Sequence, residues 1–97
     1  MKEIPDITEA IAAKQGNAKW GTDFNTIIEK LKEEIYELET AYLNHDKFDF
    51  DDELADCQFL ITRLTLLREQ SCSSLLRRAM KKHKIRETNP TYKKSKK

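Results

Sequence analysis

Hydrophobic residues recur every three or four positions along most of the chain, which is the spacing of one face of an α-helix. The longest stripe follows Thr22, a residue suited to the N-cap position, and Asp23, whose carboxylate suits the positive end of a helix dipole. The stripe predicts a helix of about five to six turns. Its apolar positions are Phe24, Ile27, Ile28, Leu31, Ile35, Leu38 and Tyr42.

A second stripe predicts another long helix, from an N-cap at Asp51 to about Gln70. The segment 44–50 between the two stripes is expected to be a short loop. Helices joined by so few residues usually lie antiparallel as neighbours. The apolar positions of this second stripe are Cys57, Leu60, Leu64 and Leu67.

A short leading helix is predicted before this pair. Asp6 can cap it, and we expect it to run to about Lys14 and to end near Gly16. Residues 16–21, which include both glycines of the chain and its one tryptophan, Trp20, are expected to form a loop.

A last helix is predicted after the pair, from Ser74 to about Arg86. Ser71 or Ser73 can serve as its cap. Asn89-Pro90 ends it, because the residue before a proline is restricted away from helical geometry.

The composition indicates a small all-α protein. Of the 97 residues, 38% are apolar and 36% are charged, with two glycines and two prolines, so turns are few and helix formers dominate. One domain is predicted over residues 1–88, followed by a basic, disordered tail over residues 89–97. We expect an antiparallel helical bundle of three main helices and a short N-terminal helix, completed by dimerisation.

Several protein classes are excluded by the same sequence. No apolar stretch approaches the roughly 20 residues that span a bilayer. No apolar run follows the N-terminus, so we expect no signal peptide. The two cysteines, Cys57 and Cys72, are then expected to be reduced thiols in a cytoplasmic protein.

Charge is unevenly distributed, although the net charge is only +1. Residues 1–70 carry 8 basic and 16 acidic side chains, whereas residues 71–97 carry 10 basic and 1 acidic. An acidic body with a basic end indicates one of two things. The end folds back on the body or on what the body binds, or it is a nucleic-acid-binding tail.

Two pairs of acidic residues at three-residue spacing are the candidate chemistry, because this spacing places each pair on one face of a helix. The pairs are Glu34 with Glu37 on the first long helix and Glu53 with Asp56 on the second. At 100° per residue, Glu53 and Asp56 fall about 20° and 40° from Leu60, in the middle of the apolar stripe. Glu34 falls on the edge of the other stripe and Glu37 just beyond it.

Like charges at buried positions are costly unless something compensates them. No basic residue is expected on the same stripe, so a divalent cation is the simplest compensation. Mg²⁺ or Mn²⁺ prefers carboxylate oxygens, and no Cys or His stands at ligand spacing. A four-carboxylate metal site is therefore predicted, although an exposed helix N-terminus would also favour an acid at Glu53.

The segments that carry these carboxylates resemble a known family signature. Glu-Glu-x-x-Glu at 33–37, followed by Glu-x-x-Asp at 53–56, is similar to the motif of the all-α nucleoside triphosphate pyrophosphohydrolases, and the chain looks like a MazG-like member. The flanking segments Leu31–Leu38 and Asp52–Leu60 support this resemblance, which covers about residues 14–86.

The resemblance implies a Mg²⁺-dependent enzyme that hydrolyses a nucleoside triphosphate to the monophosphate and pyrophosphate. It implies that the enzyme works as a dimer or a dimer of dimers. The metal ligands that it implies are Glu34, Glu37, Glu53 and Asp56. By the same resemblance, Glu33 is an outer partner of these ligands or helps to position water.

Three further residues are candidates for binding substrate. Lys82 and Arg86 share one face of the last helix, where they can hold the outgoing pyrophosphate, unless they belong to a solvated basic face. Trp20 precedes the first motif helix, and some family members place an aromatic residue from this region against the base. The alternative for Trp20 is packing of the leading loop onto the bundle.

Two other functions remain open. Phosphoribosyl-ATP pyrophosphohydrolase is a relative of the same fold, but its second motif usually continues with a Tyr-His pair, where this chain has Cys57-Gln58-Phe59. A non-enzymatic helical module would bind nucleic acid or a protein through residues 77–97, although Tyr92 is the only aromatic residue there. Burial of Glu53 and Asp56 would favour an enzyme.

Overall fold

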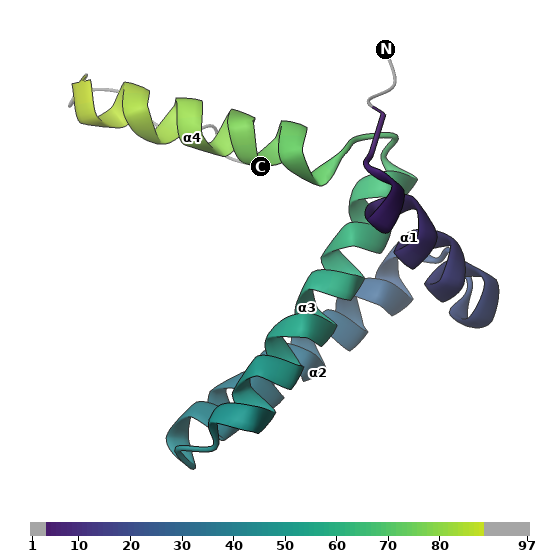
Figure 1. Cartoon of the computed structure of the whole chain (residues 1–97), viewed down its shortest axis with the longest axis vertical. Helices are drawn as coiled ribbons and strands as arrows, with labels where there is room; N and C mark the ends of the chain where they lie inside the picture. Colours follow the sequence, from purple (N-terminus) through teal and green to yellow (C-terminus); the bar gives the residue numbers. More distant parts are fainter. Residues whose placement is uncertain (1–3, 89–97) are drawn as a thin grey trace.

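The computed structural model describes residues 4–88, which fold into four α-helices (Figure 1). Their bounds are α1 Ile7–Trp20, α2 Phe24–Leu43, α3 Lys47–Leu67 and α4 Cys72–Thr88. These residues contain no strand and no helix with the length and apolar character needed to cross a membrane. The predicted all-α class is confirmed, while the tail predicted over residues 89–97 lies outside the described residues.

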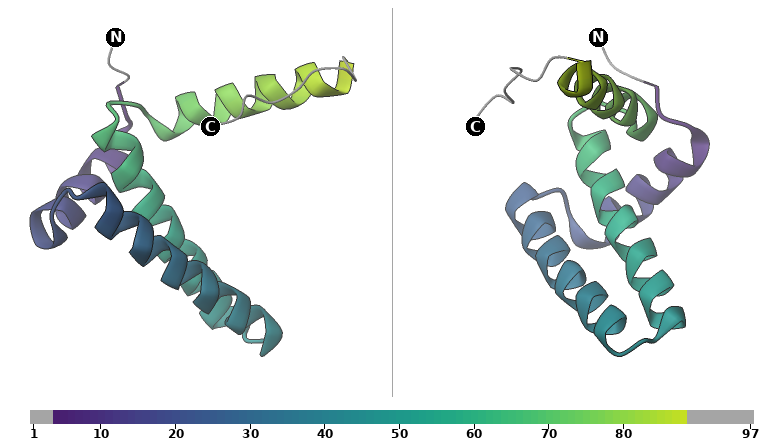
Figure 2. Two further views of the ribbon diagram at one scale, coloured as in Figure 1. Left: turned by 180° about the vertical axis from the view of Figure 1, so that it is seen from behind. Right: turned by 90° about the vertical axis from the view of Figure 1, so that its left-hand side faces the viewer.

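The two longest helices, α2 and α3, lie side by side and run antiparallel, as Figures 1 and 2 show. α1 packs against the second half of α3, and α3 contacts each of the other three helices. The buried apolar side chains come from all three of these helices: Ala13, Ile27, Ala41, Cys57 and Leu60. The centre of the fold is therefore a thin seam between helices rather than a broad core.

The loop between the long helices is shorter than the sequence predicted. Asp46, not Asp51, caps α3. Its Oδ1 accepts a hydrogen bond from the Asp49 backbone N–H at 3.0 Å, which is the contact that an N-cap residue makes. At the other end α3 stops at Leu67, short of the expected Gln70. The cap of α2 also differs, since it is Asp23 rather than Thr22.

The leading helix is longer than predicted, because Gly16 does not end it. α1 continues to Trp20 and ends at Gly21, whose φ of 86° is the left-handed conformation that glycine accepts without strain. Gly16 is buried instead, and a Cβ built on it would lie 2.5 Å from Cδ of Arg63 on α3. The glycine therefore permits close packing of two helices. The expected loop over residues 16–21 was wrong for this reason.

The last helix extends away from the α2–α3 pair (Figure 1). Ser71 caps it, since its Oγ accepts a hydrogen bond from the Ser74 backbone N–H at 3.1 Å, which decides between the two predicted caps. The start of α4 is also tied to α1, because the Cys72 N–H donates to Glu9 Oε1 at 2.9 Å. No residue of α4 is fully buried, and among residues 4–88 the helix packs only sparsely against α3.

Candidate metal centre and adjoining cavity

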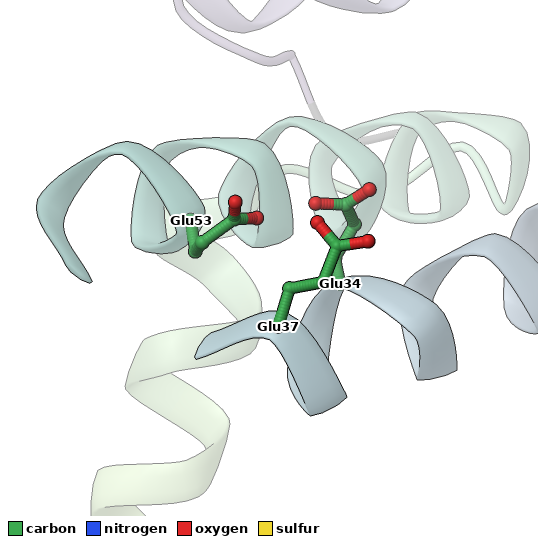
Figure 3. Close-up of side chains that lie close together, drawn as sticks. All are labelled: Glu34, Glu37 and Glu53. Carbon is green, nitrogen blue, oxygen red and sulfur yellow. The ribbon is translucent and has the colours of Figure 1, made fainter. Parts of the chain in front are cut away.

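Residues of the two acidic pairs meet across the α2–α3 interface, where the carboxyl groups of Glu34, Glu37 and Glu53 are directed toward one another (Figure 3). Oxygens of Glu34, Glu37 and Glu53 all lie within 4.8 Å of one another. A second group, Asp52, Glu53 and Asp56, meets the same distance. Glu53 belongs to both groups, so antiparallel packing joins them into one carboxylate cluster of these five residues.

Burial within the carboxylate cluster differs from the helical-wheel expectation. Glu34, expected at the edge of its stripe, is only 6% exposed, whereas Asp56 is exposed and Glu53 is half-buried. The reason is the register of α2, whose buried positions Ile27, Glu34 and Ala41 follow one another at seven-residue spacing. Seven residues are about two helical turns, so Glu34 lies at the centre of the seam with α3.

Two buried oxygens of the cluster, Oε1 of Glu34 and Oε1 of Glu53, have no hydrogen-bond partner among residues 4–88. A proton on Glu53 would supply a hydrogen bond to Glu34 that two ionised carboxylates lack. The pKa of Glu53 is raised to about 7, first by this hydrogen bond, then by desolvation and by the charges of Glu34, Glu37 and Asp56. Desolvation, followed by repulsion from Glu34 and Asp52, raises the pKa of Asp56.

These observations fit a divalent cation. Buried polar atoms are normally satisfied, so two orphaned carboxylate oxygens in one cluster call for a positive partner. The cluster offers carboxylate oxygens only, and hard cations such as Mg²⁺ and Mn²⁺ prefer that donor set. The residues present therefore suit the predicted magnesium ion.

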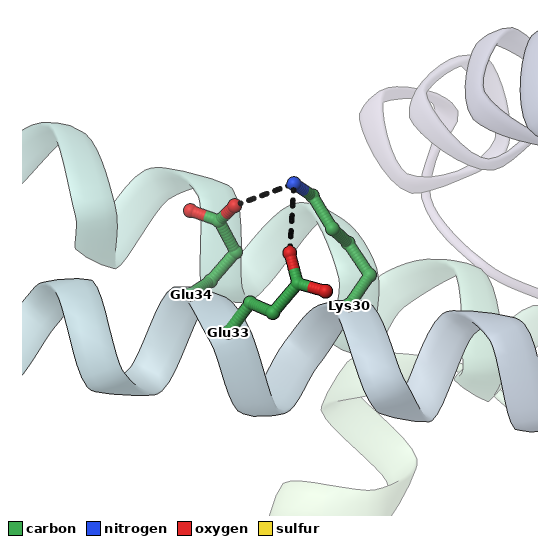
Figure 4. A network of polar contacts seen from close by, with 3 residues as sticks. All are labelled: Lys30, Glu33 and Glu34. Carbon is green, nitrogen blue, oxygen red and sulfur yellow. Dashed lines mark ion pairs between the residues drawn. The ribbon is translucent and has the colours of Figure 1, made fainter.

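Lys30 is a basic neighbour that the sequence analysis missed (Figure 4). Its Nζ lies 3.2 Å from Glu34 Oε2 and 3.5 Å from Glu33 Oε1, so the expectation of no basic partner was wrong for Glu34. Its hydrogen bond and charge interaction with Glu34, followed by the charge of Glu33, raise the pKa of Lys30. The signal was present in the sequence as the four-residue spacing of Lys30 and Glu34. Glu33 itself is exposed and points to Lys30 rather than into the cluster.

A cavity of about 390 Å³ adjoins the carboxylate cluster, and we call it the interhelical cavity. Its polar ends differ in charge, with Glu34 and Asp56 toward the cluster and Arg63 toward α1. Lys30, which pairs with Glu34, and Thr26 also line the cavity, and its remaining walls are apolar. The apolar and aromatic lining residues are Trp20, Ile27, Phe59 and Leu60. Volumes of this order hold small organic ligands.

Arg63 is a second basic residue that the sequence analysis missed. Its side chain is buried, with the whole residue 3% exposed, and burial lowers the pKa of its guanidinium. Nε donates to Asn17 Oδ1 at 3.0 Å, and Nη2 donates to the Gly21 carbonyl at 2.9 Å. Within the described part of the chain, none of the ion pairs involves Arg63. Its place at the edge of an apolar stripe was the available signal.

Trp20 lines the interhelical cavity and also packs on the bundle. Its ring meets Phe59 edge-on at a centroid distance of 6.3 Å, while Lys19 Nζ lies 4.9 Å and Arg63 Cζ 5.8 Å from the ring centre. More than half of the residue is exposed. The two roles considered for Trp20, packing and contact with a ligand, are therefore compatible.

Lys82 and Arg86 are not brought to the carboxylate cluster in the single chain. Both lie on α4, which extends away from the cluster, and neither lines the interhelical cavity. Their contact with a phosphate group stays a prediction.

Comparison with known proteins gives one family. Residues 6–83 match a protein-family model described as Phosphoribosyl-ATP pyrophosphohydrolase (PRA-PH). The matched segment contains both acidic motifs and most of the chain. No match was found among curated proteins or among solved structures. The match is to the relative that the sequence analysis weighed as an alternative, and the MazG-like assignment is not confirmed.

Proposed function

Because the chain belongs to the phosphoribosyl-ATP pyrophosphohydrolase family, we propose that it is a Mg²⁺-dependent nucleotide pyrophosphohydrolase. In this proposal a ribo- or deoxyribonucleoside triphosphate and water give the monophosphate and pyrophosphate. The observation that carries the proposal is the pair of buried, unpartnered oxygens on Glu34 and Glu53 beside a cavity of ligand size. A solvated acidic surface leaves no such oxygens, because water satisfies them.

The residues that would hold Mg²⁺, or Mn²⁺ in its place, are Glu34, Glu37, Glu53 and Asp56. The bound cation supplies charge neutralisation for the triphosphate and activation of the attacking water. A triphosphate is itself strongly anionic, so the carboxylate cluster alone would repel it. The four carboxylates therefore act by fixing positive charge beside the interhelical cavity.

Lys30 is the chain's own positive charge at this site. It lies on the wall of the interhelical cavity, one turn before Glu34, and now pairs with that carboxylate. Once Glu34 has another positive partner, the Lys30 ammonium is free to hold a phosphate oxygen. Glu33, which contacts Lys30 from outside the cluster, would orient this ammonium, in keeping with the outer role expected of it.

The family match favours a second candidate substrate, phosphoribosyl-ATP. Hydrolysis of its triphosphate breaks the same kind of phosphoric anhydride bond, so the carboxylate cluster would serve either substrate. The sequence Cys57-Gln58-Phe59 stands where that enzyme usually has Tyr-His after the second motif. For this reason we rank an ordinary nucleoside triphosphate first and phosphoribosyl-ATP second.

We propose that the working unit is a homodimer or homotetramer in which α4 of one copy covers another copy. Support comes from large apolar side chains left exposed on the helix faces, among them Ile35, Tyr36, Ile61, Leu76 and Met80. The basic α4 also complements the acidic α2–α3 pair in charge. Such an arrangement would bring Lys82 and Arg86 near the carboxylate cluster of the partner copy.

The test is pyrophosphate release from a panel of ribo- and deoxyribonucleoside triphosphates and phosphoribosyl-ATP, with Mg²⁺ and with Mn²⁺. We expect release by the wild type and its loss in Glu53→Gln, which keeps the shape of the side chain and removes its charge. Glu39→Gln, an exposed acid of α2 outside the cluster, is the matched control and should retain activity. No release from any member of the panel would overturn the proposed function.

A further inference from the structure

Arg63 is a buried cation that lies between α3 and the last turn of α1. Only 3% of the residue is exposed, and among residues 4–88 none of the ion pairs includes it. Burying a charge is costly unless something compensates it, and an apolar side chain at such a position often packs as well or better. An arginine at this position therefore indicates a role besides filling the interface between two helices.

The two hydrogen bonds of Arg63 hold the segment of α1 that carries Trp20. Nε donates to Asn17 Oδ1 at 3.0 Å, and Nη2 donates to the Gly21 carbonyl at 2.9 Å. These two acceptors stand on either side of Trp20 in the sequence, about one helical turn apart. Helix ends fray readily, so a rigid planar group bound at both points restrains the turn between them.

The Arg63 side chain also packs against α1 and against the Trp20 ring itself. Gly16 gives it room, since a Cβ there would lie 2.5 Å from Cδ and 2.7 Å from Nε. The guanidinium Cζ lies 5.8 Å from the centre of the Trp20 ring, and the Phe59 ring meets the same ring edge-on at 6.3 Å. Both the backbone and the ring of Trp20 are therefore held against α3.

The restrained Trp20 ring is part of the lining of the interhelical cavity. More than half of the residue is exposed, so ring surface is left for a ligand. Glu34 and Asp56 of the carboxylate cluster line the same cavity. A nucleotide that holds its phosphates at the cluster can therefore place its base beside Trp20. Stacking on an aromatic ring accepts every base, adenine included, because every base has a π-face.

We propose that Arg63 is a positioning residue, which fixes the end of α1 so that the Trp20 ring is in place to stack on the base of the substrate. The inference rests on the proposed function and adds to it a residue that strengthens substrate binding without choosing among the bases. A binding group that is ordered before the ligand arrives lowers the entropic cost of binding. Arg63 thereby lowers KM, while the carboxylate cluster on α2 and α3 does not depend on it.

The kinetic test measures KM and kcat for dATP and dGTP with Mg²⁺. Arg63→Lys lacks the planar fork that holds two acceptors, and Asn17→Leu removes one of the acceptors. Each should raise KM for both nucleotides on the order of tenfold and leave kcat unchanged. Asn17 is not among the residues that line the interhelical cavity, so its effect must pass through Arg63. Asn17→Asp keeps an acceptor oxygen and should retain the wild-type KM, and Arg68→Gln, at an exposed arginine just after α3, is the matched control.

Two kinetic outcomes would overturn the inference. One is an unchanged KM in Asn17→Leu, whatever Arg63→Lys does, because Arg63 would then not act through α1. The other is a fall in kcat as large as the rise in KM, or an Asn17→Asp protein as poor as Asn17→Leu, which is expected if these residues only maintain the fold. The two Asn17 variants carry the comparison if circular dichroism shows that Arg63→Lys is unfolded.

A fluorescence test separates this inference from the proposed function, because Trp20 is the only tryptophan. In the presence of EDTA, the fluorescence anisotropy of Trp20 should fall in Arg63→Lys and Asn17→Leu and should keep its wild-type value in Asn17→Asp. Quenching of Trp20 by dAMP should require a concentration on the order of tenfold higher in the first two variants.

Unchanged anisotropy in both of these variants, or equal quenching by dAMP in all four proteins, would overturn the positioning role with or without an active enzyme. Absence of pyrophosphate release from every nucleotide, with the fluorescence differences intact, would instead overturn the proposed function and leave a base-binding site that Arg63 positions.

Discussion

Replacing Gly16 by alanine tests the packing of α1 on α3 with a single methyl group. The new Cβ would lie 2.5 Å from Arg63 Cδ, 2.7 Å from Arg63 Nε and 3.0 Å from Phe59 Cε2. Non-bonded carbon atoms normally stay about 3.5–4.0 Å apart, so the arginine must move by about 1 Å. A shift of that size stretches the 3.0 Å hydrogen bond from Nε to Asn17 beyond hydrogen-bonding distance.

Opposing effects determine how much Gly16→Ala lowers the free energy of unfolding. Alanine favours a helix interior over glycine by about 1 kcal/mol. Overpacking costs about 1–3 kcal/mol, and a weakened hydrogen bond from a charged group costs about 1.5–3 kcal/mol more. We therefore expect Gly16→Ala to lower the free energy of unfolding by about 1.5–5 kcal/mol. In a domain of this size that lowers Tm by roughly 6–40 °C.

Urea and thermal unfolding of a double-mutant cycle measure this coupling. In an Arg63→Ala background the clash with the arginine is absent and only the 3.0 Å approach to Phe59 Cε2 remains, so Gly16→Ala should cost clearly less than in the wild type. Gln15→Ala, at an exposed neighbouring position of α1, is the control and should change stability by less than about 0.5 kcal/mol. A Gly16→Ala protein at least as stable as the wild type would refute this account of the packing.

Three other predictions use the same unfolding assays or a mass measurement. Mg²⁺ at about 100 times its Kd should raise the free energy of unfolding of the wild type by about 2.7 kcal/mol, and that of Glu34→Gln by far less. Equal increases in both proteins would contradict the metal site. Without metal, the folded protein holds the Glu53 proton more tightly than the unfolded chain does, because the pKa is raised from 4.5 to about 7. Stability should then fall as pH rises from about 4.5 to about 7, and a profile unaltered by Glu53→Gln would argue against this cause. Sedimentation should give a dimer or tetramer for the wild type and a smaller mass for Leu76→Asp on the exposed face of α4, whereas a monomeric wild type would contradict assembly.

The number and order of the helices could be predicted because the apolar stripes are long and regular. The helix ends were harder, because several residues compete for the same role. Asp46, Asp49 and Asp51 can each cap a helix, and the sequence alone does not say which one precedes the first turn. In a sequence, a glycine that ends a helix cannot be distinguished from a glycine that allows another helix to pack closely. Gly16 is of the second kind because the Arg63 side chain packs directly against it.

The meeting of the acidic pairs could be predicted because three-residue spacing and antiparallel packing leave little choice. Their relative burial could not, because the apolar positions of the first stripe placed Glu34 at its edge, whereas the seam with α3 passes through Glu34. The pairing of Lys30 with Glu34 could have been predicted from their four-residue spacing. The surroundings of Arg63 could not, since they depend on where the last turn of α1 docks against α3.

The isolation of α4 has a consequence for its local stability. Among residues 4–88, no residue of this 17-residue helix is fully buried and its hydrogen bonds to other helices come from Cys72 alone, so little besides backbone hydrogen bonds stabilises the rest of it, and such helices are marginal in water. Its amide hydrogens should therefore exchange with solvent through frequent local opening, long before those of α2 and α3 do. Any partner that docks on α4 must slow that exchange. The hydrogen-exchange rate of α4 therefore distinguishes the single chain from the assembled protein.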